Sequence, residues 1–163
     1  MFEMLNRRDR YEMKLVIQRV LQAQVYIDDN LFSAIGPGLM LLLGIHHQDN
    51  LEQILWSVDK LVHLRIFNDE NGKMNRNVKE CEGEILVVSQ FTLYGNCLNG
   101  RRPDFIQAAS PPIALSLYKQ FIDELKKEAP HVKTGQFGAQ MQVSLTNDGP
   151  VTFILDSLNR RKA

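Results

Sequence analysis

The sequence predicts a single α+β domain of mostly antiparallel strands with two helices packed outside them. Short apolar runs with the period of β-strands fill residues 14–45 and return from residue 132. Apolar residues spaced three and four apart, the period of a helix, occur in two segments, 50–64 and 113–128. A chain of 163 residues can form one domain with a proper core, but it is too short for two of ordinary size.

The domain is expected to open with antiparallel strands. Asp29 and Asn30 predict a two-residue hairpin turn between two of them. Arg19 falls inside the first strand, where it either faces solvent on an edge or is buried with a partner for its guanidinium; the exposed position is favoured. The predicted strands are Lys14–Leu21, Ala23–Asp28, Leu31–Ile35 and the continuously apolar Leu39–Ile45.

Two helices and a short hairpin are expected in the middle of the chain. Asp49 or Asn50 can cap the first helix. Residues 65–77 then predict a short strand, a turn and a returning strand. The second helix is expected from Ile113 to about Glu128, preceded by two prolines.

The last third is predicted to return to β-structure. Asn147-Asp148-Gly149-Pro150 is strong turn chemistry, and a hairpin turn is the expected conformation there. Proline also removes one backbone donor at that point. The strands expected around this turn are Val132–Gly135, Met141–Leu145 and Val151–Leu155.

The segment Glu84–Gly95 is the most informative stretch of the chain. Residues 85–88 are an unbroken apolar run typical of a strand buried on both faces. Ser89, Gln90 and Thr92 follow immediately, and polar groups at such depth cost about 1 to 3 kcal/mol each unless they are paired. Their side chains either bond to nearby backbone or contribute to a ligand site.

Composition excludes several classes of protein. Nineteen Lys and Arg balance nineteen Asp and Glu, which disfavours a long nucleic-acid footprint and allows contact with an RNA end. Cys81 and Cys97 lack the spacing of a zinc site, and a disulfide framework is not expected. His46-His47 and His63 occur without a carboxylate constellation, so no metal is expected.

No apolar run approaches the ~20 residues of a membrane span, so a membrane is not an expected partner and a cytoplasmic location is expected. The balanced charge makes DNA an unexpected partner as well. Residues 1–12, with three arginines, are expected to form a peripheral, disordered extension. The predicted domain covers residues 13–156, and residues 157–163 form a basic tail.

Two short motifs of the sequence, taken together, are specific enough to indicate a protein family. Ser89–Leu93 (SQFTL), followed some fifty residues later by Asn147–Thr152 (NDGPVT), resembles the motif pair of the D-aminoacyl-tRNA deacylases. The resemblance extends from about Met13 to Leu155. Further segments that resemble the family in the same order are Val16–Val20, Ile35–Leu39, Leu64–Phe67, Gly72–Asn75, Gly100–Pro103, Phe137–Ala139 and Met141–Val143.

The resemblance implies a homodimer of barrel-like domains that acts on the acceptor end of tRNA. Members of the family cleave the ester between a D-amino acid, or glycine, and the terminal adenosine, and they need no cofactor or metal. Gly149-Pro150 would be a cis pair that enters the partner subunit's pocket and excludes L-amino acids, with Arg19 holding the pair in place. Such a wall near Cα would reject one enantiomer without reading the side chain.

The resemblance places catalysis at Ser89, Gln90, Phe91 and Thr92, with Phe137 and Met141 lining the pocket. Thr92 could attack the ester, but the sequence places no base beside it. Alternatively, the 2'-hydroxyl of the tRNA assists while groups of this motif polarise the carbonyl. Two other functions stay open: a non-catalytic RNA-binding module, and a small-molecule esterase with Thr92 or Ser89 as nucleophile.

Overall fold

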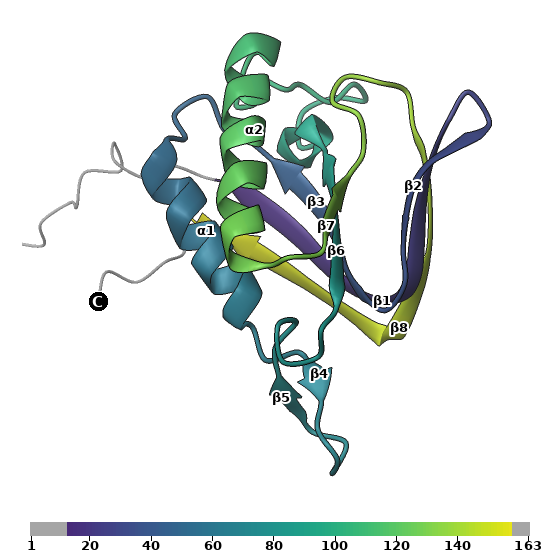
Figure 1. Ribbon diagram of the computed structural model, residues 1–163. Coiled ribbons are helices and arrows are strands. Elements are labelled where there is room, and N and C mark those ends of the chain that lie inside the picture. The colour runs from purple at the N-terminus through teal and green to yellow at the C-terminus, as the bar shows by residue number, and fades with distance from the viewer. Residues whose placement is uncertain (1–12, 158–163) are drawn as a thin grey trace, which may run out of the picture.

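The structure is a computed structural model that describes residues 13–157; the predicted extension and residues 158–163 of the predicted tail lie outside the described residues. One sheet runs in the order β2-β1-β3-β6-β7, and β8 pairs with the other edge of β1 (Figure 1). Its strands are β1 (Lys14–Ile27), β2 (Asn30–Ile35), β3 (Gly38–Gly44), β6 (Glu84–Ser89), β7 (Val132–Thr134) and β8 (Gln142–Asp156). The other elements are α1 (Leu51–His63), β4 (Phe67–Asn68), β5 (Met74–Arg76), the 3₁₀ helix η2 (Phe91–Tyr94) and α2 (Pro111–Glu128).

The sheet is nearly closed into a barrel. Pairings of β1 with β2, β3 and β8 are antiparallel, whereas β6 runs parallel to β3 and β7. Side chains bridge the remaining edges, since Ser33 Oγ donates to the carbonyl of Thr134 at 2.9 Å and Lys133 Nζ donates to that of Ala34 at 2.6 Å. The predicted α+β class and barrel-like sheet are confirmed.

Apolar residues form two cores, one on each face of the sheet. The larger lies between the sheet and the paired helices α1 and α2, where Leu15, Leu41 and Phe121 are fully buried. The smaller fills the barrel and includes Val25 and Leu86. Strands β3 and β6 contribute to both cores, which explains why their sequences are continuously apolar.

The first hairpin differs from its prediction in two ways. Residues 14–27 form one continuous strand, and the predicted break at residue 22 coincides with a change of partner from β3 to β2. The turn lies one residue earlier than expected, at Asp28 and Asp29, whose φ values are 49° and 60°. Two successive residues with positive φ form the type of turn that matches the twist of a hairpin.

The hairpin predicted at Asn147–Pro150 is wrong. Residues 142–156 are one strand, β8, and both of its halves pair with β1. Val20 pairs with Asn147 and Gln18 with Thr152, so four residues of β8 stand opposite Arg19 alone. Residues 148–151 therefore form a bulge. The same Asn, Asp, Gly and Pro residues suit a bulge on an edge strand as well as a turn.

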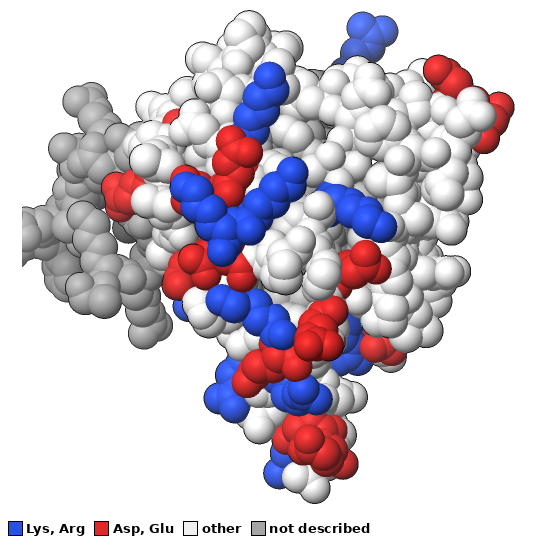
Figure 2. All heavy atoms as spheres, in the orientation of Figure 1, with Lys and Arg blue, Asp and Glu red and all other residues white. Residues whose placement is uncertain are grey.

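The helices agree closely with the sequence. Asn50 caps α1 with a reciprocal capping box, and α2 begins at Pro111, two residues before its predicted start. Among residues 13–157, no helix combines the length and apolarity of a membrane span. Charges of both signs run over the face in Figure 2 from the helices α1 and α2 down to β4 and β5, while the right side of this face is largely uncharged apart from acidic residues at the upper right, at the tip of the β1–β2 hairpin.

Candidate active site

Strand β6 ends in the polar motif, and the chain turns sharply there. Gln90 N donates to the carbonyl of Leu43 at 2.8 Å, which extends the pairing with β3 by one residue. Residues 91–94 then form η2, so the predicted strand does not continue through the motif. The turn leaves Phe91 56% exposed, whereas Tyr94 is buried against Gly44.

A cavity of about 640 Å³ lies beside the motif, and five of the predicted site residues line it. They come from segments far apart in the sequence, because β7 lies next to β6 and brings the following loop to the same place. Gly135 N donates to the carbonyl of Val87 at 3.0 Å and anchors that loop. The predicted residues in the wall are Ser89, Gln90, Phe91, Phe137 and Met141.

Thr92 lies outside the cavity wall, on η2. Gln90 Nε2 donates a hydrogen bond to Thr92 Oγ1. A neutral amide is not a base at physiological pH, so this contact orients the hydroxyl without activating it. The first N–H groups of a helix have no partner within it, and at η2 those groups belong to Phe91 and Thr92.

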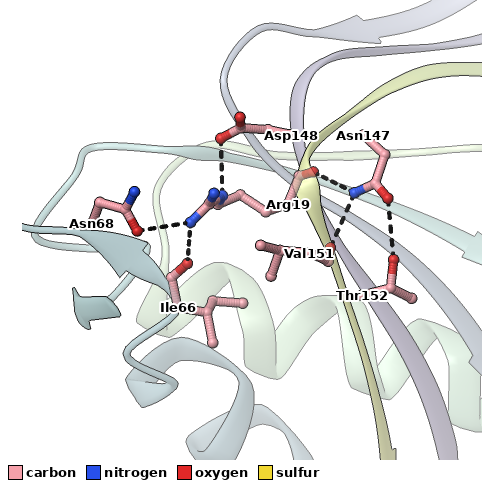
Figure 3. A network of polar contacts seen from close by, with 7 residues as sticks. All are labelled: Arg19, Ile66, Asn68, Asn147, Asp148, Val151 and Thr152. Carbon is pink, nitrogen blue, oxygen red and sulfur yellow. Dashed lines mark hydrogen bonds and ion pairs between the residues drawn. The ribbon is translucent and has the colours of Figure 1, made fainter. Parts of the chain in front are cut away.

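Arg19 is buried, contrary to the exposed position that the sequence favoured, with 6% of its surface accessible. Its Nη1 donates to the carbonyl of Ile66 at 2.8 Å and to Asn68 Oδ1 at 3.3 Å. Its Nε lies 2.9 Å from Asp148 Oδ2 in an ion pair (Figure 3). Arg19 therefore connects the base of the β4–β5 hairpin to the bulge of β8.

Asn147 closes the bulge from the other side. Its Nδ2 donates to the carbonyl of Val151 at 3.0 Å and to that of Arg19 at 2.9 Å (Figure 3). Thr152 Oγ1 donates to Asn147 Oδ1 at 3.2 Å, which fixes the orientation of the amide. Gly149 and Pro150, joined by a cis peptide bond, are exposed at the tip of the bulge.

Comparison with known proteins agrees with the motifs. A model of the D-Tyr-tRNA(Tyr) deacylase family matches residues 16–156. This chain belongs to that family. A D-aminoacyl-tRNA deacylase of Protochlamydia amoebophila (strain UWE25) is 98% identical over 151 residues, which are 93% of this chain and 100% of that protein.

Two solved structures resemble this deacylase-family chain. One, named c-Myc DNA Unwinding Element Binding Protein, is 43% identical with a TM-score of 0.83, and the match covers 87% of this chain and 97% of that one. The other is described as a probable eukaryotic D-amino acid tRNA deacylase, with 21% identity and a TM-score of 0.76. That match covers 89% of this chain and 99% of the other, and at this identity it supports the shared fold alone.

The two motifs of the deacylase family lie apart within one chain. Val143, at the start of β8, lines the cavity. Gly149 follows six residues later on the same strand, which corresponds to roughly 15 to 20 Å along it. The structure thus brings five predicted residues together at the cavity and groups Arg19 with the bulge at a separate place.

Sequence reasoning missed part of the cavity wall. Phe105 lies in it and contacts Phe91 edge to face, with 5.1 Å between the ring centroids. Ser110 and Pro111, at the start of α2, also line it. The aromatic residue just after the Gly100–Pro103 segment was the available signal, but only the folded chain shows that this loop returns to the motif.

Burial shifts two titrating groups near the site. It raises the pKa of Tyr118 to about 12, and the phenol donates to the carbonyl of Val87 at 3.1 Å. Burial, followed by the charges of His47 and Lys14, lowers the pKa of His46 to about 4. Within the described range 13–157, no three His, Cys, Asp or Glu residues form a group suited to a metal ion.

Proposed function

We propose that this protein hydrolyses the ester between a D-amino acid and the 3'-terminal adenosine of tRNA and spares the L-ester. The observation that carries the proposal is the position of Ser89, Gln90 and Phe91, the first three residues of the SQFTL motif, in the wall of a cavity of about 640 Å³, in a chain of the deacylase family. The D-aminoacyl-tRNA deacylase of Protochlamydia amoebophila, at 98% identity, supports the same activity. We assign residues 13–156 to the deacylase domain.

The chemistry we propose needs no protein nucleophile. Thr92 Oγ1 accepts a hydrogen bond from the amide of Gln90, and an amide N–H cannot take up the proton of the hydroxyl, so activation of Thr92 as a nucleophile is not supported. The neighbouring 2'-hydroxyl of the terminal adenosine instead orients a water molecule, which attacks the ester carbonyl and releases the free amino acid and the 3'-hydroxyl of the tRNA, while N–H groups at the start of η2 polarise that carbonyl. Ser89 and Gln90 orient the substrate, and Phe91 packs on the adenine. The reaction requires neither metal nor cofactor.

A second copy of the chain completes the site in this proposal. Gly149 and Pro150 are exposed and roughly 15 to 20 Å along β8 from the cavity of their own subunit. A pair of subunits related by a two-fold axis would place each bulge in the partner's cavity. The largely uncharged right side of the face in Figure 2 supports such an interface. Strands β2 and β8 also carry exposed apolar side chains, which include Leu31, Phe32, Phe153 and Ile154.

The bulge would then face the Cα of the bound aminoacyl group. Arg19 holds the bulge through the carboxylate of Asp148, and Asn147 holds it through the carbonyl of Val151, so the bulge forms a rigid wall that an L-side chain would strike. Glycine has no Cβ and passes the same wall, which makes glycyl-tRNA a second substrate. Action on tRNA implies that the protein works in the cytoplasm.

Hydrolysis of matched D-tyrosyl-, L-tyrosyl- and glycyl-tRNA by the purified protein, with a metal chelator present, tests the proposal. Rapid loss of the D- and glycyl esters with the L-ester spared is the expected result. Equal cleavage of both enantiomers would leave an esterase and remove the chiral role of the bulge. No cleavage above buffer would remove the activity itself.

A second candidate function is nucleic-acid binding without catalysis. It is favoured by the name of one structural relative, which describes that protein as binding a DNA unwinding element. The zero net charge of this chain weighs against an extended DNA footprint. Tight binding of single-stranded DNA or deacylated tRNA, together with no ester hydrolysis, would favour this candidate.

A further inference from the structure

Residues 96–106 form a loop beside the cavity mouth, which we call the cavity-mouth loop. Asn96 and Asp104 exchange backbone hydrogen bonds of 2.9 and 3.2 Å, so residues 97–103 project from a closed base. Phe105 follows this base, lines the cavity and packs against Phe91 of the motif. The projecting part therefore has a defined position relative to the site.

The loop carries an unusual combination of exposed side chains. Leu98 is 92% exposed and Ile106 is 81% exposed, the two highest values among the exposed large apolar residues of the described chain. Arg101 and Arg102 are exposed between them. No ion pair or hydrogen bond involves either guanidinium within residues 13–157. Two free positive charges beside apolar surface fit a ligand with both phosphates and flat, weakly polar groups.

We propose that the cavity-mouth loop binds the single-stranded 3' end of the tRNA, upstream of the adenosine that enters the cavity. Arg101 and Arg102 pair with phosphates, while Leu98 and Ile106 contact sugar and base faces. This inference rests on the proposed function, because it needs the terminal ester to occupy the cavity. It explains how a protein of zero net charge can hold a polyanion, since two local charges at the strand's exit suffice for its end.

Two substrates with the same ester test this assignment. D-Tyrosyl-tRNA has phosphates that can reach the loop, whereas D-tyrosyl-adenosine has none. In the double variant Arg101→Gln/Arg102→Gln, we expect kcat/KM for the tRNA to fall about tenfold at low salt. The value for D-tyrosyl-adenosine should stay within about twofold of the wild type, because the cavity is unchanged.

Salt dependence gives an independent readout of the same contacts. Two phosphate contacts to a single strand contribute a slope of about −1.4 to log kcat/KM against log salt, and the double variant should lose that share. Between about 50 and 200 mM salt the wild-type activity should then fall about sevenfold more than that of the variant. In contrast, Leu98→Ser with Ile106→Ser should lower activity on tRNA without changing the slope.

Lys126→Gln with Lys127→Gln is the matched control, because it removes two exposed positive charges from the far end of α2. It should leave both substrates and the slope unchanged. Equal tRNA activity in the arginine variant and this control would overturn the assignment, as would a parallel loss on D-tyrosyl-adenosine. If the wild-type protein cleaves the tRNA ester and the arginine variant cleaves it equally well, the loop assignment alone fails; if the wild-type protein does not cleave the tRNA ester, the proposed function fails and the assignment falls with it.

Discussion

Replacing Gly149 by alanine should both destabilise the protein and weaken its choice between enantiomers. The added Cβ would lie 2.7 Å from Val151 Cγ2, 3.0 Å from Val151 N and 3.2 Å from Arg19 Nη2. Gly149 also has φ of 118°, which residues with a side chain rarely adopt. The backbone conformation costs about 1 to 3 kcal/mol, and the crowding adds about 1 to 3 kcal/mol.

A loss of about 4 kcal/mol corresponds to a Tm lower by roughly 8 to 16 °C for a chain of this size. Gly72→Ala is the matched control, since Gly72 has φ of 75° and no atom lies within 4 Å of the place that an added methyl group would take. This control should cost about 1 to 2 kcal/mol. Both variants are melted at equal protomer concentration, because association would stabilise the folded state.

The same two variants are then assayed on D- and L-tyrosyl-tRNA. Relief of the crowding requires the bulge to move away from Val151 or Arg19, so the ratio of D- to L-ester hydrolysis should fall in Gly149→Ala and stay constant in Gly72→Ala. A Gly149→Ala protein that melts like the control and keeps the wild-type ratio would refute both the packing argument and the wall.

Four other outcomes are expected. Asn147→Asp replaces the donor to two carbonyls by an oxygen, so urea unfolding should show a loss of about 2 to 4 kcal/mol, with Asn30→Asp nearly neutral. Thr92→Ala should keep single-turnover hydrolysis within about tenfold of the wild type; a loss above about a thousandfold would make Thr92 the nucleophile. The pKa of His46 is lowered from 6.5 to about 4, so between these pH values the native state binds fewer protons at His46 than the unfolded state does. The free energy of unfolding, measured by urea titration at each pH, should therefore fall by at most about 3 kcal/mol as the pH drops from 6.5 to 4. His46→Gln should reduce this pH dependence. Tyr118→Phe removes one of two donors to the carbonyl of Val87, and Gly135 N remains as the other, so the free energy of unfolding should fall by only about 0.5 to 1.5 kcal/mol in the same assay.

Local patterns in the sequence predicted the elements well where one segment determines its own conformation. Asn50 caps α1 as expected, and the apolar run of β6 is buried on both faces. Long-range pairing was not predictable in the same way. Nothing local distinguishes the bulge at Asn147–Pro150 from a turn, because the difference is whether both flanking segments pair with β1.

The same difference between local and long-range information applies to the candidate site. Ser89 and Gln90, which line the cavity, could be assigned to a candidate site because polar groups followed a buried strand, whereas Phe91 was assigned through the family resemblance. Burial of Arg19 could not be predicted, since its partners, Asn68 and Asp148, lie 49 and 129 residues away in the sequence. Phe105 was missed for the same reason, because its contact with Phe91 depends on the path of a loop.

Strand β8 fixes the distance between the cavity and the bulge through the number of residues between Val143 and Gly149. Val143 at the cavity and Gly149 at the bulge are connected by one strand that is paired with β1 on both sides of the bulge, so the number of residues between them determines their separation. Deleting one residue would turn every following side chain to the opposite face, and deleting two would restore the faces but shift the bulge by about 7 Å. In the proposed dimer, an insertion or deletion here would therefore misalign the bulge with the partner's cavity even if every residue of both motifs were kept.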